Sequence, residues 1–332
     1  MNLLVTGGAG FIGSHFVLRH KERFPDDFLV VLDKLTYAGN KDFLMPVLDS
    51  IRFVQADITD TLLVADIVTQ YGIDAIVNFA AETHVDRSIA NAVPFIHTNI
   101  LGIQSLIEVC RKFPHVLLLH ISTDEVYGDL KDGDPPCTVY AVLRPSSPYA
   151  ATKAAGDLLL LSAVRTFGIR ARITRCTNNY GPHQADEKFL PTVIRYAMKD
   201  ERIPVYGEGK NKRDWLYVTD HTDAIELVLE KGKDGHTYLI SADNERENID
   251  AAKTVLDFLK KPHALIEFVK DRPGHDWRYA LDASSILALD WKPKISFEDG
   301  LRRTVEWYRR AGRRSPLPAI RPRAHGRGAG EG

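Results

Sequence analysis

Short apolar runs alternate with helix-like stretches along the first half of the chain. Branched apolar residues mark the predicted strands, which are NLLVTG, FLVVLD, IRFVQAD, DAIVNFA, HVLLLHIS and ARITR. Helical periodicity lies between and after them, over residues 14–23, 62–70, 95–111 and 148–167. Strands that alternate with helices predict βαβ units and a parallel sheet with both faces covered. Because such crossovers are right-handed, we expect a doubly wound, Rossmann-like α/β fold.

In the second half this pattern loosens, and Asn, Pro, Gly and charged residues become more frequent. We expect residues 1–180 to form the Rossmann-like domain, and residues 181–213 and 243–310 to form a smaller mixed α/β lobe. Residues 214–242 carry a helix pattern and a strand pattern, so we expect them to rejoin the first domain. Residues 311–332 are rich in Arg, Gly and Pro and have no apolar periodicity, which predicts a disordered basic tail.

Composition narrows the class of protein. The 332 residues are 44% hydrophobic and 26% charged, with a formal net charge of -1, as in ordinary soluble proteins. Near-neutral charge argues against nucleic acid or an anionic membrane as a partner, and the longest apolar runs are too short to span a bilayer. Without a signal peptide pattern, we expect a cytoplasmic protein. Three cysteines, Cys110, Cys137 and Cys176, fit a reducing compartment and do not indicate a metal site.

A glycine-rich turn joins the first predicted strand to the first helix. Its glycines follow a G-x-x-G-x-x-G pattern at Gly7, Gly10 and Gly13. Such a turn lets the backbone approach a pyrophosphate at the helix N-terminus. Asp33 ends the second strand, where its carboxylate can bind both ribose hydroxyls and would repel a 2′-phosphate. NAD is therefore predicted over NADP, although Lys34 weakens this preference, and Asp57 at the end of the third strand could meet the adenine. The alternative is a structural turn with two capping aspartates.

A tyrosine and a lysine stand at helical spacing after the long loop. Ser147 can cap a helix that begins with Pro148, which places Tyr149 and Lys153 four residues apart on one face. A nearby ammonium lowers the pKa of a phenol, so we expect Tyr149 to serve as a base. A Y-x-x-x-K spacing also arises by chance in helices, and only its combination with the glycine turn makes it a strong signal.

The strand HVLLLHIS ends in two carboxylates, Asp124 and Glu125, in the stretch STDEVYG. Taken alone, these residues could simply cap a turn. Two adjacent carboxylates near one site instead push their pKa values apart, which leaves one protonated and one ionised. The pattern thus raises the hypothesis of an acid and a base at the ligand-binding edge of the sheet.

These motifs resemble the extended short-chain dehydrogenase/reductases, and within them the nucleotide-sugar 4,6-dehydratases. The resemblance covers nearly all of the chain up to about residue 310. It rests on the segments TGGAGFIGSH, DKLTYAGN, NFAAETHVDRSI, STDEVYG, SPYAATKAAGD, TRCTNNYGP, EKFLP, VYGEGKNKRDWLYV and DRPGHDWRYALD. It implies a redox triad of Thr123, Tyr149 and Lys153. It also implies that Asp124 is the acid and Glu125 the base of a dehydration, since related epimerases usually carry a small or hydroxyl residue at the position of Asp124.

The resemblance also implies which residues bind ligands. NAD contacts are expected from Gly7, Gly10, Phe11, Ile12, Gly13, Asp33, Lys34, Leu35, Thr36, Asp57, Ile58, Phe79, Ala80, Ala81, Thr98, Tyr149, Lys153 and Asn179. Nucleotide-sugar contacts are expected from Thr83, Thr123, Asn178, Glu187, Lys188, Phe189, Leu190, Pro204, Val205, Tyr206, Arg213, Asn248, Arg272 and His275. Of these, Arg213 and Arg272 suit bidentate binding of a pyrophosphate. No metal is predicted, because His84 and Asp86 have no third ligand at a suitable spacing.

The implied reaction is the dehydration of a nucleotide sugar, with dTDP-glucose as the expected substrate. The resemblance further implies a homodimer through a four-helix bundle, built from the apolar helices at 95–111 and 148–167. Residues 129–146 depart from the family pattern and are expected to form a loop near the sugar. Two alternatives remain open: an epimerase, decarboxylase or dehydratase of the same superfamily acting on a UDP-sugar, and a non-catalytic NAD-binding regulatory protein.

Overall fold

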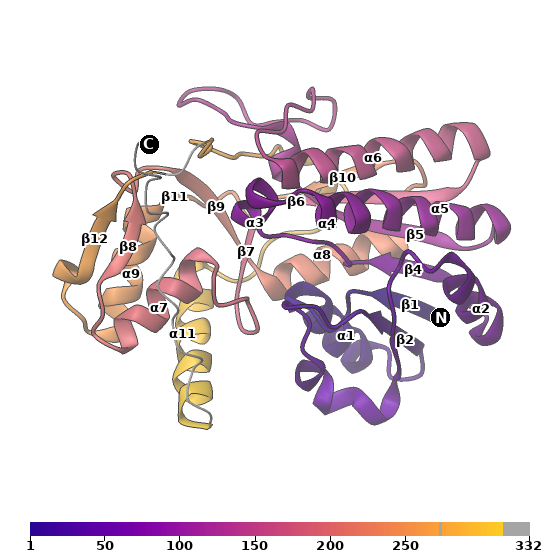
Figure 1. Cartoon of the computed structure of the whole chain (residues 1–332), viewed down its shortest axis with the longest axis horizontal. Helices are drawn as coiled ribbons and strands as arrows, with labels where there is room; N and C mark the ends of the chain where they lie inside the picture. The colour runs from indigo at the N-terminus through magenta and orange to yellow at the C-terminus, as the bar shows by residue number, and fades with distance from the viewer. Residues whose placement is uncertain (272–273, 315–332) are drawn as a thin grey trace, which may run out of the picture.

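A seven-stranded parallel sheet forms the centre of the larger lobe (Figure 1). The computed structural model describes residues 1–271 and 274–314, with the backbone alone for 311–314. The strands run in the order β10-β6-β5-β4-β1-β2-β3. Their bounds are β1 Asn2–Thr6, β2 Phe28–Asp33, β3 Arg52–Gln55, β4 Ala75–Asn78, β5 Leu117–Thr123, β6 Arg170–Cys176 and β10 Thr237–Ile240. This arrangement confirms the predicted Rossmann-like α/β class.

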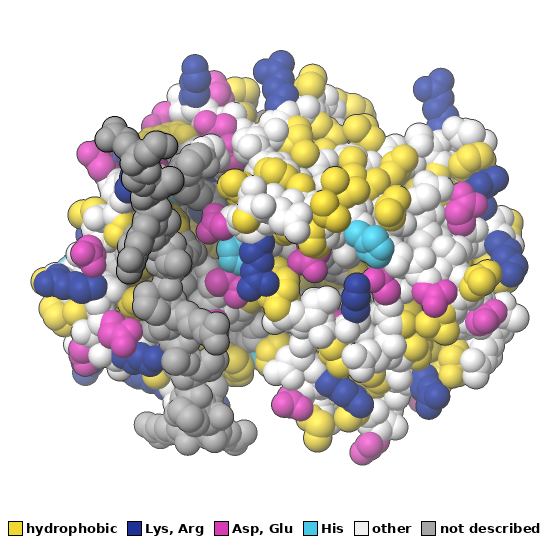
Figure 2. Space-filling model, in the orientation of Figure 1, with side chains coloured by type: hydrophobic (Ala, Val, Ile, Leu, Met, Phe, Trp, Pro, Cys, Tyr) yellow, Lys and Arg dark blue, Asp and Glu magenta, His cyan; other side chains and the backbone are white. Residues whose placement is uncertain are grey.

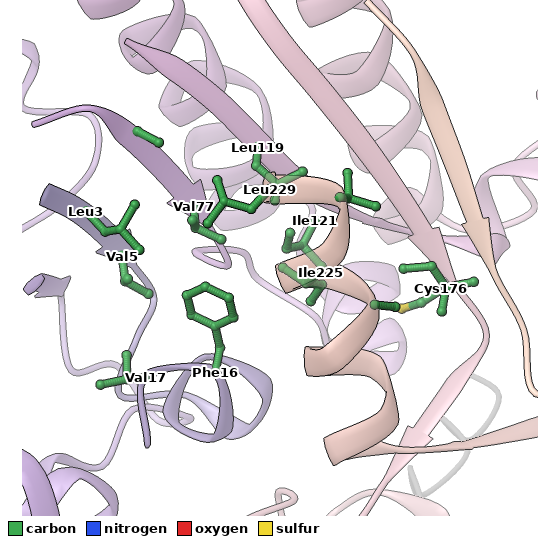
Figure 3. Close-up of a cluster of buried hydrophobic side chains, with 14 of the residues drawn as sticks. Leu3, Val5, Phe16, Val17, Val77, Leu119, Ile121, Cys176, Ile225 and Leu229 are labelled. Atoms are coloured by element: carbon green, nitrogen blue, oxygen red, sulfur yellow. The ribbon is translucent and has the colours of Figure 1, made fainter. Parts of the chain in front are cut away.

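Helices cover both faces of this sheet. The helices of the larger lobe are α1 Phe11–Arg23, η1 Lys41–Ser50, α2 Thr61–Tyr71, α3 Val85–Ala90, α4 Val93–Ile96, η2 His97–Leu101, α5 Gly102–Lys112, η3 Asp124–Tyr127, α6 Pro148–Phe167, α8 Val218–Lys231 and α10 Ser284–Leu287. On β1, Leu3 and Val5 face α1 and α8, where they pack near Phe16 and Ile225 (Figure 3). Leu4 between them faces α2, α5 and α6 instead. The two-residue period of the strand thus divides one apolar run between two cores.

The register of the sheet brings the ends of β1, β4 and β5 together. Thr6 pairs with Asn78, and Asn78 pairs with His120. Because all seven strands are parallel, the loops that follow them leave from one edge of the sheet. Ligands bind at this edge in doubly wound folds.

The smaller lobe contains a three-stranded sheet, β11-β9-β7, and a two-stranded sheet, β12-β8. Its elements are β7 Asn178–Tyr180, α7 Phe189–Met198, β8 Ile203–Tyr206, β9 Lys212–Tyr217, β11 Glu245–Glu247, α9 Asn248–Leu259, η4 His263–Leu265, β12 Ile266–Val269 and α11 Phe297–Arg314. Its core contains aliphatic side chains and an aromatic group, in which the ring centroid of Tyr180 lies 5.3–6.1 Å from those of Trp215, Tyr217 and Phe297.

Two expected boundaries differ from the structure. In the segment 214–242, the helix α8 packs against α1 and the strand β10 enters the large sheet beside β6, but the first residues belong to β9, which pairs with β7 and β11 in the smaller lobe. The basic tail begins later than residue 310, because α11 continues to Arg314. The remainder of that predicted tail lies outside the described residues.

Other elements match the hydrophobic pattern with local changes. The helix expected over 95–111 begins at Val93 and contains a π-helical turn, η2, before α5. The run Val93–Lys112 is long and apolar enough to cross a membrane by length and composition, but half of it is buried, as in a core helix. After β2, where no element is predicted, η1 forms a 3-10 helix that packs against α1.

Candidate active site

A cavity of about 290 Å³ opens at the carboxyl edge of the large sheet. All five predicted catalytic residues line it, together with every predicted NAD residue except Leu35. Leu35 instead has a positive φ of 55° and packs against the hydrophobic core. Further lining residues, which the sequence reasoning did not identify, are Leu32, Ala38, Gly39, Ala56, Glu82, Ile121, Ser122, Cys176, Thr177, His183, Gln184 and Ala185.

Glycines shape the wall of the cavity at the N-terminus of α1. Gly7 has a φ of 67°, and a Cβ there would lie 2.5 Å from the backbone nitrogen of Ala80. A Cβ on Gly13 would lie 2.3 Å from the carbonyl oxygen of Gly7. No side chain fits at either position, so the turn can close tightly beneath the start of α1. Gly10, Phe11, Ile12 and Gly13 at this helix end line the cavity, and a helix N-terminus favours binding of a pyrophosphate.

Asp33 ends β2 and lines the cavity, where the sequence predicts a contact with the ribose. Its two oxygens accept hydrogen bonds from the amides of Ala9 (2.9 Å) and Leu35 (2.8 Å), which holds the side chain in place. Lys34 donates to Asp57 at 2.7 Å. The cation that could have attracted a 2′-phosphate is therefore paired with a second carboxylate, which favours NAD over NADP.

The turn after β5 brings the predicted acid and base into the cavity. Thr123 caps η3: its hydroxyl accepts from the amide of Glu125 (3.3 Å) and donates to Oδ1 of Asp124 (3.1 Å). Asp124 is only 3% exposed. Burial, and next the charge of Glu125, raise the pKa of Asp124 well above its ordinary value. This direction agrees with a protonated Asp124 at neutral pH.

Tyr149 and Lys153 lie on α6, both almost fully buried beside the cavity. Ser147 caps this helix, with its hydroxyl accepting from the amide of Ala150. The expected lowering of the Tyr149 pKa is wrong for the protein alone. Burial, and next the charge of Glu125, raise the pKa of Tyr149 well above its ordinary value. The Lys153 ammonium donates to the carbonyl of Ile121 at 2.7 Å.

The predicted nucleotide-sugar residues fall into two groups. Thr83, Thr123, Asn178 and Lys188 line the cavity, and the Lys188 ammonium donates to the carbonyl of Thr83 at 3.0 Å. The remaining described ones belong to the smaller lobe and do not line it; they are Glu187, Phe189, Leu190, Pro204, Val205, Tyr206, Arg213, Asn248 and His275. Arg272 lies outside the described residues.

Three members of the second group show what the smaller lobe offers. The rings of Tyr206 and His275 lie 6.0 Å apart. The Arg213 guanidinium donates to the carbonyls of Lys212, Asp276 and Trp277 within 3.2 Å, which leaves fewer of its five N–H groups for a pyrophosphate than we expected. The side chains of Leu190 and Val205 are buried in the core of the lobe, so they are not accessible to a ligand.

Unsatisfied polar atoms test whether this cavity suits a polar ligand. In the described part of the chain, Asp124 Oδ2, Thr177 Oγ1, Asn178 Oδ1 and Gln184 Oε1 are buried without a hydrogen-bond partner, and all four residues line the cavity. Buried polar groups normally have partners, so these atoms fit contacts with a bound dinucleotide or sugar. Over residues 1–271 and 274–314, no cluster of His, Cys, Asp and Glu could hold a metal ion.

Comparison with known proteins places this geometry in context. Residues 4–304 match the family model described as GDP-mannose 4,6 dehydratase. The chain is 48% identical to a dTDP-glucose 4,6-dehydratase of Mycobacterium tuberculosis over 93% of both chains, and 47% identical to dTDP-glucose 4,6-dehydratase 1 of Escherichia coli over 93% of this chain and 92% of that one.

Solved structures show the same relationship. DesIV, a dTDP-glucose 4,6-dehydratase of Streptomyces venezuelae solved with NAD bound, is 45% identical with a TM-score of 0.90, over 94% of this chain and 98% of that one. A UDP-glucose 4-epimerase of Thermus thermophilus in complex with NAD is 28% identical with a TM-score of 0.85, over 93% of this chain and 99% of that one. The fold is therefore shared by enzymes of different activity, and the site has to distinguish them.

Proposed function

The chain belongs to the GDP-mannose 4,6-dehydratase family, among the relatives named dTDP-glucose 4,6-dehydratases, and from this premise we propose that it converts dTDP-glucose to dTDP-4-keto-6-deoxyglucose with NAD as its cofactor. The observation that carries the proposal is the pair Asp124–Glu125 beside the triad Thr123, Tyr149 and Lys153 in one cavity. The triad serves oxidation and reduction in general. The two carboxylates add the acid and base that elimination of water needs.

The first step is oxidation at carbon 4 of the sugar. Tyr149 takes the proton of the 4-hydroxyl, Thr123 hydrogen-bonds the reacting oxygen, and the Lys153 ammonium stabilises the phenolate. Bound NAD supplies the acceptor for the hydride from carbon 4 and the donor for its return to carbon 6. With NAD bound, the positive charge of the oxidised nicotinamide would favour the phenolate of Tyr149, which burial in the protein alone opposes.

The second step is loss of water across carbons 5 and 6. The 4-keto group makes the carbon 5 proton acidic, and Glu125 takes it. Asp124 gives its proton to the 6-hydroxyl, which leaves as water. When hydride reaches carbon 6, Glu125 returns a proton to carbon 5. The raised pKa of Asp124 supports these roles, because only a protonated carboxyl can assist the leaving group.

A turnover assay without added cofactor tests the proposal. The purified protein is incubated separately with dTDP-glucose and UDP-glucose, and a 4-keto-6-deoxy product is sought by mass spectrometry. We expect product from dTDP-glucose at catalytic ratios, because the cofactor is regenerated in every cycle. Absence of product from both sugars, in protein shown to contain NAD, would refute the proposal.

We also propose that the protein is a cytoplasmic homodimer formed through the helices predicted over 95–111 and 148–167, which are the run α4, η2 and α5 and the helix α6, with α3 beside them. Hydrophobic side chains gather over this region of the surface (Figure 2). The large exposed ones are Ile89, Val93, Ile96, Leu101 and Leu158, which we call the helical patch. Burying such a patch against a second copy would pair two helices from each chain and build a four-helix bundle.

Sedimentation of two matched variants tests the dimer. Leu158 is 56% exposed within the helical patch, while Leu62 on α2 is 79% exposed outside it. We expect Leu158→Glu to shift the protein to a monomer, because a charge would be buried at the interface. Leu62→Glu should sediment like the wild type. Equal behaviour of the two variants would contradict the proposed interface.

A further inference from the structure

A buried row of polar side chains lies beneath the cavity, across three neighbouring strands. Thr6 Oγ1 donates to Asn78 Oδ1 at 2.5 Å, and Asn78 Nδ2 donates to His120 Nδ1 at 3.0 Å. All three side chains are at most 1% exposed. Because Nδ1 of His120 accepts a hydrogen bond, the proton of the neutral ring belongs on Nε2, which faces α6.

A carboxylate on α6 meets this row from the other side. Asp157 is fully buried, and its Oδ1 lies 3.6 Å from His120 Nε2. Its Oδ2 accepts from Ser122 Oγ at 3.0 Å and from Arg175 Nε at 2.8 Å. Arg175 in turn donates to the hydroxyl of Tyr127 at 2.6 Å. The carboxylate is therefore held from β5 and β6 as well as by its own helix.

Lys153 stands one helical turn before Asp157, so the two side chains share a face of α6. Its ammonium donates to the carbonyl of Ile121 and lies 3.3 Å from His120 Nε2. Burial lowers the Lys153 pKa from 10.5 to about 8, and the charge of Asp157 is the largest influence that opposes this fall. Without that charge, burial would favour a neutral amine.

Other titratable groups also surround Lys153. From β6 it faces Cys176, whose thiol has a pKa that burial raises, while Arg175 on the same strand contacts Asp157. Asp124 and Glu125 line the same cavity from η3, and Tyr149 does so from α6. Helices α3, α4 and α5 also pack on α6, but among the described residues none of their charged groups contributes to the shift of the Lys153 pKa. Among the described residues, Asp157 is therefore the carboxylate whose charge affects the Lys153 pKa.

We propose that Asp157 is a positioning residue of the active site, whose buried carboxylate, held by Ser122 and Arg175, helps to keep the ammonium of the catalytic Lys153 in place at the cavity. Because Arg175 and Ser122 hold its Oδ2, Asp157 acts on the ammonium as a nearby charge, and no direct bond draws Lys153 away from the cavity. This inference rests on the proposed function for its catalytic meaning. The charge relationship itself does not depend on which substrate is bound.

Titration of Lys153 in isotope-labelled protein tests the inference by NMR. The signal of its ammonium end is assigned by its loss in Lys153→Met. We expect a midpoint near pH 8 in the wild type and a midpoint lower by about one unit in Asp157→Asn, because an opposite charge has been removed. Tyr127→Phe is the matched control, since it removes a hydrogen bond from the same cluster and leaves every charge. Its midpoint should stay at the wild-type value.

An unchanged midpoint in folded Asp157→Asn would overturn the inference and reduce Asp157 to a packing role. If Asp157→Asn does not fold, Asp157→Ser takes its place, because its smaller side chain leaves room for water beside Arg175. The alkaline limb of turnover should move with the NMR midpoint in each variant. A moved midpoint in a protein that turns over no nucleotide sugar would refute the proposed function and leave the role of Asp157 standing.

Discussion

Replacing Glu125 with glutamine separates the two halves of the proposed reaction. Glutamine keeps the size of the side chain and its place in η3 but cannot accept the proton of carbon 5. A positioned general base contributes about 10²–10⁴-fold, or roughly 3–5 kcal/mol of the barrier. We therefore expect product formation by Glu125→Gln to fall by a factor in that range, while oxidation at carbon 4 continues.

The same substitution should also change the pH dependence of the oxidation step, because Glu125 is a charged neighbour of Tyr149. The charge of Glu125 raises the pKa of both Tyr149 and Asp124, second only to burial. Removal of that charge lowers the pKa of Tyr149, so its phenolate forms at lower pH. We expect the pH dependence of the oxidation step to move toward lower pH in Glu125→Gln.

Single-turnover absorbance measures both steps in one experiment. Substrate is mixed with excess enzyme, reduced nicotinamide is followed by its absorbance, and product is followed by quenching. Reduced cofactor should accumulate in Glu125→Gln, since its reoxidation waits for the elimination. Asp124→Asn is the matched control, because it leaves the charge of Glu125 in place. It should slow elimination but shift the pH dependence of oxidation less than Glu125→Gln does. Equal loss of both steps in Glu125→Gln would refute the role of Glu125 as the base.

Two further predictions concern binding and stability. Gly7→Ala should yield protein without NAD, because the new Cβ would lie 2.5 Å from the Ala80 nitrogen at a φ of 67°; nucleotide released on denaturation measures this, and a wild-type content would contradict the glycine argument. Burial holds the pKa of His221 at about 3, so the unfolded chain binds a proton that the folded chain does not once the pH falls below about 6.5. As the pH decreases through this range, the free energy of unfolding should therefore decrease by up to about 1.4 kcal/mol per pH unit. Urea titrations at several pH values measure this dependence, which His221→Asn should weaken. An unchanged pH dependence in His221→Asn would argue against His221 as its source.

Several parts of the site follow from local sequence. The glycine turn, the position of Asp33 and the Y-x-x-x-K spacing each occupy a few neighbouring residues, and strand ends in a parallel sheet meet at one edge. For that reason the predicted catalytic residues, and all predicted NAD residues except Leu35, line a single cavity. Leu35 does not line the cavity, because its backbone has a positive φ and its side chain packs against the core.

Other parts could not be read from the sequence, because they depend on contacts between distant segments. The loop that carries His183 and Gln184 reaches the cavity only through the packing of the smaller lobe on the larger one: His183 stacks on Phe43 at 4.0 Å and lies 5.5 Å from the ring of Trp307. The sequence also predicted the wrong direction for the shift of the Tyr149 pKa. The spacing of residues shows that a lysine is near, but it does not show how deeply the phenol is buried, and burial raises this pKa.

The amino-acid sequence by itself determined most strands and helices of the larger lobe and the side chains at the strand ends, because the two-residue and 3.6-residue periods and the turn residues are local properties. Only the tertiary structure decided how those side chains are charged and supported. Burial and the charge of Glu125 raise the pKa of Asp124. Ser122 on β5 and Arg175 on β6 hold the carboxylate of Asp157, which stands one helical turn after Lys153 on α6. Such effects arise from desolvation and from charges brought together across the fold, and neither is encoded in the spacing of residues along the chain.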